Sequence, residues 1–510
     1  MGKGITGGHA MSLWDGIWGG LAAATSWPAC ALMLLTIPIG LVIGIIPGMG
    51  GNMGLALLIP FTFGMQPIAG FAFLLGMHAV VHTGGSIPAI LFDTPGTGPN
   101  AATCIEGFPM AQKGEAGRAL GAALTSSMLG GVLGAIFMAM IIPVLRPLVL
   151  AFGPPEFFMM AIMGLAFISL MAGESLLKGL MAGGMGLIIS FVGMDPQTGV
   201  VRFSYGMLGL MDGINIVTVV VGLFALAEVI DMGVKGGAIA HTESADVKGT
   251  GVMQGIKDCF TYWWLLLRCS IIGNIIGIIP GLGGDAAAFI CYGHAVQTTK
   301  QRDQFGKGCV EGVIATDSAH NSKEGGALIP TLAFGVPGSS GMAILLGAFM
   351  ILGVSPGREM FTKHLDLVFS MVWVLVFANI IAVMLCLPFA GKMAKITFIR
   401  TSVMIPFILV CGILGSYLTT SKIGDILITV IFGGVGYAMK KFDYARGPLI
   451  LGIVLGRIAE NALHVSLNLY GLMFLFRPIT LILLIITLAT VLFPVYKDRV
   501  KKRTARGGIG

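Results

Sequence analysis

The chain has 510 residues, of which 55% are hydrophobic and only 11% are charged, and its formal net charge is +7. A soluble protein carries roughly 25% charged residues, so the composition excludes an ordinary soluble domain and indicates an integral membrane protein. The positive charge lies largely in loops and in the C-terminal stretch YKDRVKKRTAR, which indicates membrane topology and not nucleic-acid binding.

Apolar stretches long enough to cross a bilayer recur along the chain. They cover residues 121–143, 157–173, 179–194, 214–230, 366–388, 401–419 and 475–495. The apolar residues run continuously and glycine is abundant, with 77 residues, which is typical of packed membrane helices and not of barrel strands. We expect an all-α polytopic membrane protein with roughly 10–12 spanning segments.

Two pairs of similar segments indicate an internal repeat. GLVIGIIPGMGG at 40–51 and GNIIGIIPGLGG at 273–284 are identical at nine of twelve positions. In the same order, GGSIPAILFDTPGTG at 84–98 resembles GGALIPTLAFGVPGSS at 325–340, with matching residues 242 positions apart. Each half therefore contains two broken apolar segments, typical of transporters with re-entrant hairpins.

The repeat and the loop charges suggest domain boundaries. We expect an N-terminal segment at 1–28, a first transmembrane repeat at 29–231, a cytoplasmic linker at 232–258, a second transmembrane repeat at 259–495 and a basic cytoplasmic tail at 496–510. The basic loops can all lie on the cytoplasmic side together with the C-terminus, which leaves loops such as 145–156 and 195–206 outside.

Matched loops have opposite charge character. Residues 61–70 carry no charge, whereas their counterpart at 294–303 leads into a basic run. After the second break the relation reverses, because 111–118 is strongly basic and its counterpart at 355–360 is only weakly so. We therefore predict inverted repeats, an architecture of secondary transporters.

The Gly-Pro breaks are the candidate transport site. Proline removes an amide donor and glycine frees the backbone, so peptide groups lie unpaired at membrane depth, where they need a ligand, water or protein. Unwound carbonyls suit a cation, and helix N-termini with nearby hydroxyl or amide side chains suit an anion. The alternative is that these glycines only allow close helix packing. The candidate substrate-binding residues are Ser86, Thr94, Gly96, Thr97, Asn100, Asn321, Ser322, Gly338, Ser339 and Ser340; the candidate cation-coupling residues are Gly48, Gly50, Asn52, Asp93, Gly281, Gly283 and Asp285.

Two features of the breaks have competing interpretations. Asp93 lies inside a break, where an intramembrane carboxylate is a functional candidate, but it could equally cap a helix. His78 and His82 have the i, i+4 spacing of a metal pair, but no third ligand accompanies them. For the two histidines we favour packing or the lining of a substrate cavity, and we expect no metal site.

The sequence contains no enzymatic constellation. No phosphate-binding G-x-x-x-x-G-K-[ST] motif occurs, and we find no nucleophile–base pair. We therefore expect neither an ATP-driven pump nor an enzyme, and no cofactor. Na⁺ or H⁺ is the expected coupling ion.

Long ordered motifs resemble a known family. GIIPGMGG, HTGGSIPAILFDTPGTGPNAATCIEGFPMAQKGEAGRAL, FGPPEFF, GIIPGLGG and FGKGCVEGVIATDSAHNSKEGGALIPTLAFGVPGSSGMAILLGAFMILGVSPG are similar to the large membrane subunit of the tripartite tricarboxylate transporters. The resemblance covers about residues 30 to 490. It implies a bacterial inner-membrane carrier that works with a small membrane subunit and receives a carboxylate from a periplasmic binding protein.

The resemblance also implies cation-coupled symport and an elevator-type carrier, in which the breaks form two facing hairpin tips on a moving unit while segments 121–143 and 366–388 form a scaffold. This sequence departs from the family pattern at Thr83, usually Tyr, at Asp93, usually Asn, and in TDSAHNS at 316–322. These changes fall in the expected site, so the resemblance does not fix the substrate as citrate. A passive anion channel is the alternative function, and a homo-oligomer is left open.

Overall fold

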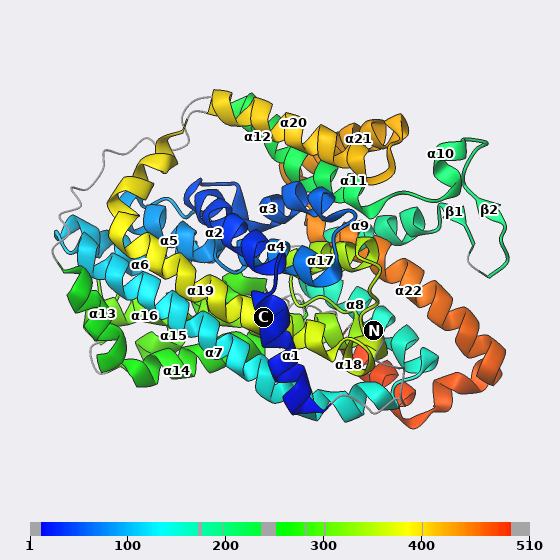
Figure 1. Ribbon diagram of the computed structural model, residues 1–510, viewed down its shortest axis with the longest axis horizontal. Helices are drawn as coiled ribbons and strands as arrows, with labels where there is room; N and C mark the ends of the chain where they lie inside the picture. The colour runs from blue at the N-terminus through cyan, green and yellow to red at the C-terminus, as the bar shows by residue number, and fades with distance from the viewer. Residues whose placement is uncertain are drawn as a thin grey trace, which may run out of the picture.

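The computed structural model describes residues 12–171, 176–195, 197–235, 251–280, 283–299, 302–399 and 401–490. In these ranges nearly all regular structure is helical, and the strands are the short β1 (Gly193–Met194) and β2 (Val201–Arg202), paired antiparallel. The expected all-α fold is confirmed. Figure 1 shows the helices packed in several directions, as broken membrane helices require, and not as one parallel bundle.

The first part of the chain, up to residue 235, ends with a helix that changes to π-helical winding partway along. Its helices are α1 (Leu13–Thr25), α2 (Ala29–Ile45), α3 (Gly50–Leu58), η1 (Ile59–Thr62), α4 (Pro67–His78), α5 (Val81–Phe92), α6 (Asn100–Gln112), α7 (Ala116–Ala151), α8 (Pro154–Met171), α9 (Leu176–Ser190), α10 (Leu208–Met211), α11 (Ile216–Val220), the π-helical η2 (Val221–Leu226) and α12 (Ala227–Lys235).

The second part begins with a bent pair of helices, α13 and α14. It includes the long helix α16, which contains Asp317, Lys323 and Glu324. Its helices are α13 (Val252–Thr261), α14 (Trp263–Ile278), α15 (Gly283–Thr298), η3 (Arg302–Gln304), α16 (Val310–Phe334), α17 (Ser340–Ile351), α18 (Arg358–Thr362), α19 (Leu365–Met393), η4 (Ala394–Phe398), α20 (Thr401–Thr420), α21 (Ile423–Lys441), α22 (Arg446–Tyr470) and η5 (Gly471–Phe476).

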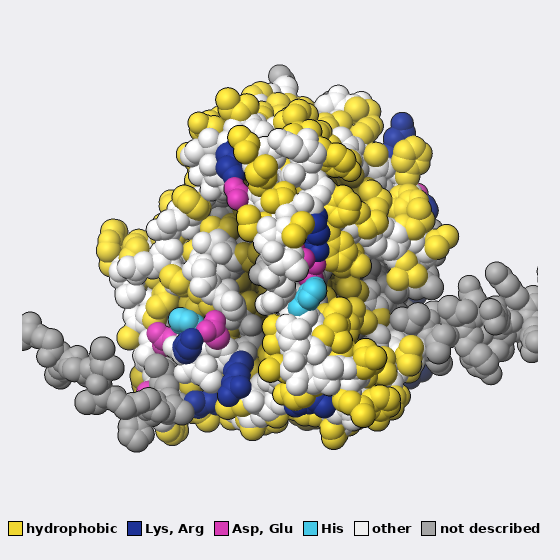
Figure 2. Space-filling view, turned by 90° about the vertical axis from the view of Figure 1, so that its right-hand side faces the viewer, with side chains coloured by type: hydrophobic (Ala, Val, Ile, Leu, Met, Phe, Trp, Pro, Cys, Tyr) yellow, Lys and Arg dark blue, Asp and Glu magenta, His cyan; other side chains and the backbone are white. Residues whose placement is uncertain are grey.

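Seven helices among the described residues are long and apolar enough to cross a bilayer, and bent helix pairs raise that number to nine. They include α7, α19 and α20, which contain the expected segments 121–143, 366–388 and 401–419. Three other expected spans, 157–173, 179–194 and 475–495, contain shorter apolar helices among the described residues, Pro154–Ala166, Leu177–Ser190 and Pro478–Thr490. Figure 2 shows apolar side chains over much of one face, with charged side chains in small groups.

The helices end at the Gly-Pro breaks. Between α2 and α3, Gly48 and Gly50 adopt φ angles of 84° and 63°, in the left-handed region that favours glycine. Asp93 ends α5 with φ of 50°, and Gly335 ends α16 with φ of 67°. These two left-handed residues are 242 positions apart, the offset of the sequence repeat.

Equivalent glycines of the two repeat copies pack against equivalent backbone atoms. A Cβ atom added at Gly44 would lie 1.9 Å from the Val81 carbonyl oxygen, and one at Gly277 would lie 2.3 Å from the Lys323 carbonyl oxygen. Gly277 and Lys323 follow Gly44 and Val81 by 233 and 242 positions, the two offsets of the repeat. The two copies therefore pack alike at these points, and the inverted relation of the halves stays a prediction.

α7 lies against α16 through glycines. A Cβ atom added at Gly130 would lie 2.2 Å from the Ser318 carbonyl oxygen, and one at Gly134 would lie 2.5 Å from the Ser322 carbonyl oxygen. Small residues at these positions let the two helix backbones approach closely. The division into scaffold and moving unit stays a prediction.

Candidate functional site

The N-terminal ends of α3 and α17 meet inside the molecule. Asn52, in the first turn of α3, donates its Nδ2 hydrogen to Ser340 Oγ over 2.8 Å. The next residue, Gly341, lies so close to His78 that an added Cβ would be 2.7 Å from the ring. Two helix N-termini at one point place the positive ends of two helix dipoles together, and this arrangement favours an anion.

The equivalent helices of the repeat form a second pair. α15 is the counterpart of α3, and it begins beside α6, the counterpart of α17. A Cβ atom added at Gly284 would lie 3.0 Å from Pro99 Cγ and 2.7 Å from Lys323 Cε. Each half of the chain therefore contributes one helix N-terminus to each pair.

Glu324 on α16 forms the centre of a buried charged cluster. Its carboxylate lies 2.6 Å from Lys323 Nζ, 3.3 Å from His82 Nε2 and 3.5 Å from His78 Nε2. None of these side chains is more than 8% exposed. Buried charges are costly unless they are paired, and Lys323 supplies the opposite charge.

Two members of the cluster retain unused hydrogen-bonding atoms. His78 Nδ1 is buried and has no hydrogen-bond partner among the described residues, while His78 Nε2 and Glu324 Oε2 meet only each other, across a long 3.5 Å. The His78 ring lies against Gly51 at the start of α3 and against Gly341 at the start of α17. Buried polar atoms are normally satisfied, so these incompletely satisfied atoms beside two helix N-termini indicate a place for a bound ion or substrate.

Side chains of the first hairpin extend this network. His82 Nδ1 lies 2.9 Å from Thr97 Oγ1, and Thr97 donates its hydroxyl hydrogen to Asn100 Oδ1. Asn100 donates from Nδ2 to Ser86 Oγ over 2.9 Å and to the His82 carbonyl oxygen over 3.1 Å. The predicted residues Ser86, Thr97 and Asn100 are therefore brought together, and His82 links them to Glu324.

Asp317 is a second carboxylate that is fully buried near the network. It accepts hydrogen bonds from Ser86 over 2.5 Å and from Thr103 over 2.9 Å, and it lies 3.1 Å from His320 Nε2. These bonds join α16 to α5 and α6. Asp317 therefore holds the first hairpin onto α16.

Asn321 links α16 to neighbouring helices at a point away from the tips of α3 and α17. It donates from Nδ2 to Thr83 Oγ1 over 2.8 Å and to Asn379 Oδ1 over 2.7 Å, and Thr83 Oγ1 lies 2.9 Å from Ser127 Oγ. These contacts tie α16 to α5, α19 and α7. The predicted substrate residue Asn321 thus has its donors engaged within the protein.

The other predicted residues lie apart from the network or make local contacts with the backbone. Thr94 bonds to the Phe92 carbonyl oxygen, Ser322 bonds to its own helix, and Ser339 caps α17. Asp93 is exposed at the C-terminal end of α5 and does not cap the start of a helix. Added Cβ atoms would meet backbone at Gly96 and Gly338 but nothing within 4 Å at Gly48 and Gly50. Gly283 begins α15, while Gly281 and the Asp285 side chain lie outside the described residues.

The sequence interpretation missed the charged side chains of α16 as site residues. Lys323 and Glu324 stand in a helix whose residues 310–333 are all buried. The sequence did offer a signal for them: Lys323 and Glu324 are two adjacent charged residues between the break motifs at 273–284 and 325–340, and charged residues inside a membrane segment are candidates for a functional site. His78 and His82 line the cluster, and among the described residues no group of three His, Cys, Asp or Glu could hold a metal ion.

One family model and two relatives match the chain. Residues 30–451 match the model of the tripartite tricarboxylate transporter TctA family. An Agrobacterium vitis protein described as an uncharacterized 52.8 kDa protein in the TAR-I ttuC' 3'region is 31% identical over 91% of this chain and 93% of its own length. A second A. vitis protein, from the TAR-II ttuC' 3'region, is 30% identical over 38% of this chain and 79% of its own length. No solved structure matches the chain.

Proposed function

Since the chain belongs to the tripartite tricarboxylate transporter TctA family, we propose that it is a cation-coupled secondary importer of a tricarboxylate or related organic anion. The observation that carries this proposal is the meeting of the α3 and α17 N-termini beside the buried His78 ring, whose Nδ1 has no hydrogen-bond partner among the described residues. Na⁺ or H⁺ is the coupling ion.

The site suits a carboxylate that enters together with a cation. Helix N-termini and the side chains of Asn52 and Ser340 offer donors to an anion. The Glu324 carboxylate repels that anion, since two like charges at short range in a buried site oppose each other strongly. A bound Na⁺, or a proton on the cluster, removes this repulsion, and binding of the anion and of the cation are then coupled.

The pairing of helices supports inverted repeats and alternating access. A two-fold axis makes contacts occur in reciprocal pairs. If one helix of the first copy contacts a second helix of the other copy, the counterparts of these two helices also contact each other. α3 with α17 and α15 with α6 follow this rule. In our proposal the hairpins α5–α6 and α16–α17 carry the site in an elevator-type movement.

The proposal includes the other components of a tripartite system. The family membership implies a small membrane subunit and a binding protein; we propose that the latter delivers the carboxylate from the periplasm. The chain then lies in the bacterial inner membrane with its C-terminus in the cytoplasm, as the basic loops suggest.

Uptake of radiolabelled citrate, succinate and other carboxylates into proteoliposomes tests the function. The protein is reconstituted with a small subunit and a binding protein of the tripartite type, and a Na⁺ gradient, a pH gradient or neither is imposed. We expect accumulation above equilibrium only with one of the gradients. Equal rates of equilibration in all three conditions would identify a passive channel instead.

A further inference from the structure

A cavity of about 400 Å³ lies at the far end of α17 from the tip site. α17 reaches it with Met350 and Ile351, whereas its first residue, Ser340, bonds to Asn52. Twelve helical residues span roughly 18 Å, so the cavity is separate from the Glu324 cluster. The remaining lining comes from Phe63, the segment 209–216, Thr419, Thr420, Lys422 and Asp425, and from Ile453, Val454 and Arg457 of α22.

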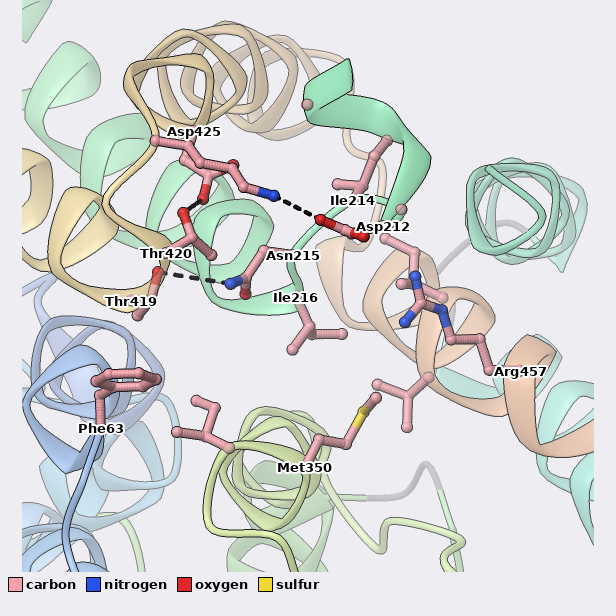
Figure 3. A pocket seen from close by; sticks show the side chains of 16 residues that line it. Phe63, Asp212, Ile214, Asn215, Ile216, Met350, Thr419, Thr420, Asp425 and Arg457 are labelled. Carbon is pink, nitrogen blue, oxygen red and sulfur yellow. Dashed lines mark hydrogen bonds and ion pairs between the residues drawn. The ribbon is translucent and has the colours of Figure 1, made fainter. Parts of the chain in front are cut away.

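Arg457 is the cationic side chain of this cavity that makes no direct ion pair with a described residue. Figure 3 shows its side chain reaching from α22 into the cavity, on the side opposite Asp425. Its guanidinium group has no hydrogen bond or ion pair with any residue that the structure describes. It lies against Gly213, where an added Cβ would be only 2.2 Å from Nη2. The group is therefore held in position without direct contact to a carboxylate. Glu460 attracts it from a distance, but both oxygens of that carboxylate are bound by Arg202.

The other charged residues of the cavity are already engaged. Lys422 Nζ donates to Asp212 Oδ2 over 2.6 Å, which leaves this pair neutral and holds the pKa of Asp212 below its usual value. Asp425 accepts a hydrogen bond from the Thr420 hydroxyl and lies in the first turn of α21, where the helix dipole stabilises a carboxylate. Among the charged lining residues, Arg457 alone makes no hydrogen bond to a residue that the structure describes.

We propose that this cavity is a second carboxylate site, at which Arg457 holds one carboxylate group of the substrate before the substrate reaches the α3–α17 tips. Arginine binds carboxylates with two parallel hydrogen bonds. Ile216, Met350 and Ile453 offer apolar surface to the carbon chain. Because loops such as 195–206 are predicted to lie outside, the cavity faces the side from which an importer receives its substrate.

This inference rests on the proposed function for the identity of its ligand, and a cysteine-protection experiment tests it separately. Met350, which is 50% exposed, is replaced by cysteine in the full chain, and the rate of reaction with a membrane-impermeant maleimide is measured. The protein without the Met350→Cys substitution gives the background labelling that comes from the native cysteines. Citrate is added at increasing concentration, with sodium chloride at matched ionic strength as the comparison.

We expect citrate to slow labelling of Met350→Cys. Adding Arg457→Gln should raise the citrate concentration for half-protection about tenfold or more, since hydrogen bonds to charged groups are worth about 1.5–3 kcal/mol. Arg457→Lys, which keeps the charge, should retain part of the protection. Arg358→Gln removes an exposed arginine of α18 and should change nothing.

Equal protection in the Met350→Cys protein with and without Arg457→Gln, or no protection in either, would overturn the second site. Adding Gly338→Val, which should block transport at the tips, should leave the protection intact. Loss of protection in that variant would instead assign citrate to the tip site. Carboxylate uptake without Arg457-dependent protection would refute this inference alone, and Arg457-dependent protection without gradient-driven uptake would refute the proposed function alone.

Discussion

His82 and Glu324 contact each other although they are 242 residues apart and occupy equivalent positions in the two repeat copies, with 3.3 Å between His82 Nε2 and Glu324 Oε1. A residue meets its own counterpart where a two-fold axis passes between them. If the halves are inverted as we predict, the approximate axis passes through the charged cluster. It also means that one position of the repeat has become a histidine in one half and a carboxylate in the other.

Glu324→Gln should destabilise the protein, because Lys323 is then left as a buried charge without its partner. Removing one partner of a buried ion pair typically costs about 3–5 kcal/mol. The double variant Lys323→Met with Glu324→Gln should recover most of the stability but not cation-coupled uptake. Thermal unfolding in detergent and uptake in proteoliposomes measure the two effects.

Glu359→Gln is the control for that series, since Glu359 and Lys363 form an exposed pair, with side chains 48% and 67% exposed. An exposed pair contributes at most about 1 kcal/mol. If Glu324→Gln unfolds at the same temperature as Glu359→Gln, the buried pair is not what stabilises the cluster.

Gly44→Ala should destabilise the contact between α2 and α5. The added methyl group would lie 1.9 Å from a backbone carbonyl oxygen, so the helices must separate. Overpacking of this kind costs about 1–3 kcal/mol. Gly184→Ala is the matched control, because an added Cβ there meets nothing within 4 Å and alanine is favoured in a helix by about 0.5–1 kcal/mol. A similar melting temperature in both variants would contradict the tight contact.

Gly96→Val and Gly338→Val should each abolish uptake. Added Cβ atoms would lie 2.0 Å from the Gly44 carbonyl oxygen and 2.5 Å from that of Gly277, so either hairpin would be forced away from the helix that supports it. Uptake is measured after the amount of each variant in the membrane has been matched to the parent protein. Normal uptake by both variants would refute the assignment of the hairpins to the transport site.

The bond between Asn52 and Ser340 should couple the two helix ends. We expect Asn52→Ala and Ser340→Ala each to raise the KM for carboxylate uptake, and the double variant to raise it by less than the product of the single effects. Residues in one hydrogen-bonded pair show interaction energies of about 0.5–3 kcal/mol. Strictly multiplicative effects would show that the two side chains act independently.

Asp93→Asn should leave the ion dependence of uptake unchanged. Asp93 is exposed and ends α5 in a left-handed conformation, which asparagine also adopts readily. Uptake against Na⁺ concentration and against pH is the measurement for both proteins. A shift of either curve would return Asp93 to the cation site that its position in the sequence suggested.

The breaks and the long helices were predictable from sequence because they depend on local chemistry. Proline and glycine within apolar runs end helices wherever the chain packs, so the ends of α2, α5 and α16 follow from the motifs. The partners of Glu324 were not predictable, because His78 and His82 reach it only after α4 and α5 pack against α16. Arg457 gave no sequence signal, since its lack of a partner is a property of the folded cavity.

The contact of Gly44 with the Val81 carbonyl also explains why the duplication can still be read in the sequence. A position where any side chain would strike the backbone cannot drift, so both copies keep glycine at Gly44 and Gly277 however long they have diverged. Positions facing the charged cluster have no such restriction and have become His82 in one copy and Glu324 in the other. The two halves thus remain similar in sequence at these tightly packed positions and differ at the charged cluster, where their side chains have different chemistry.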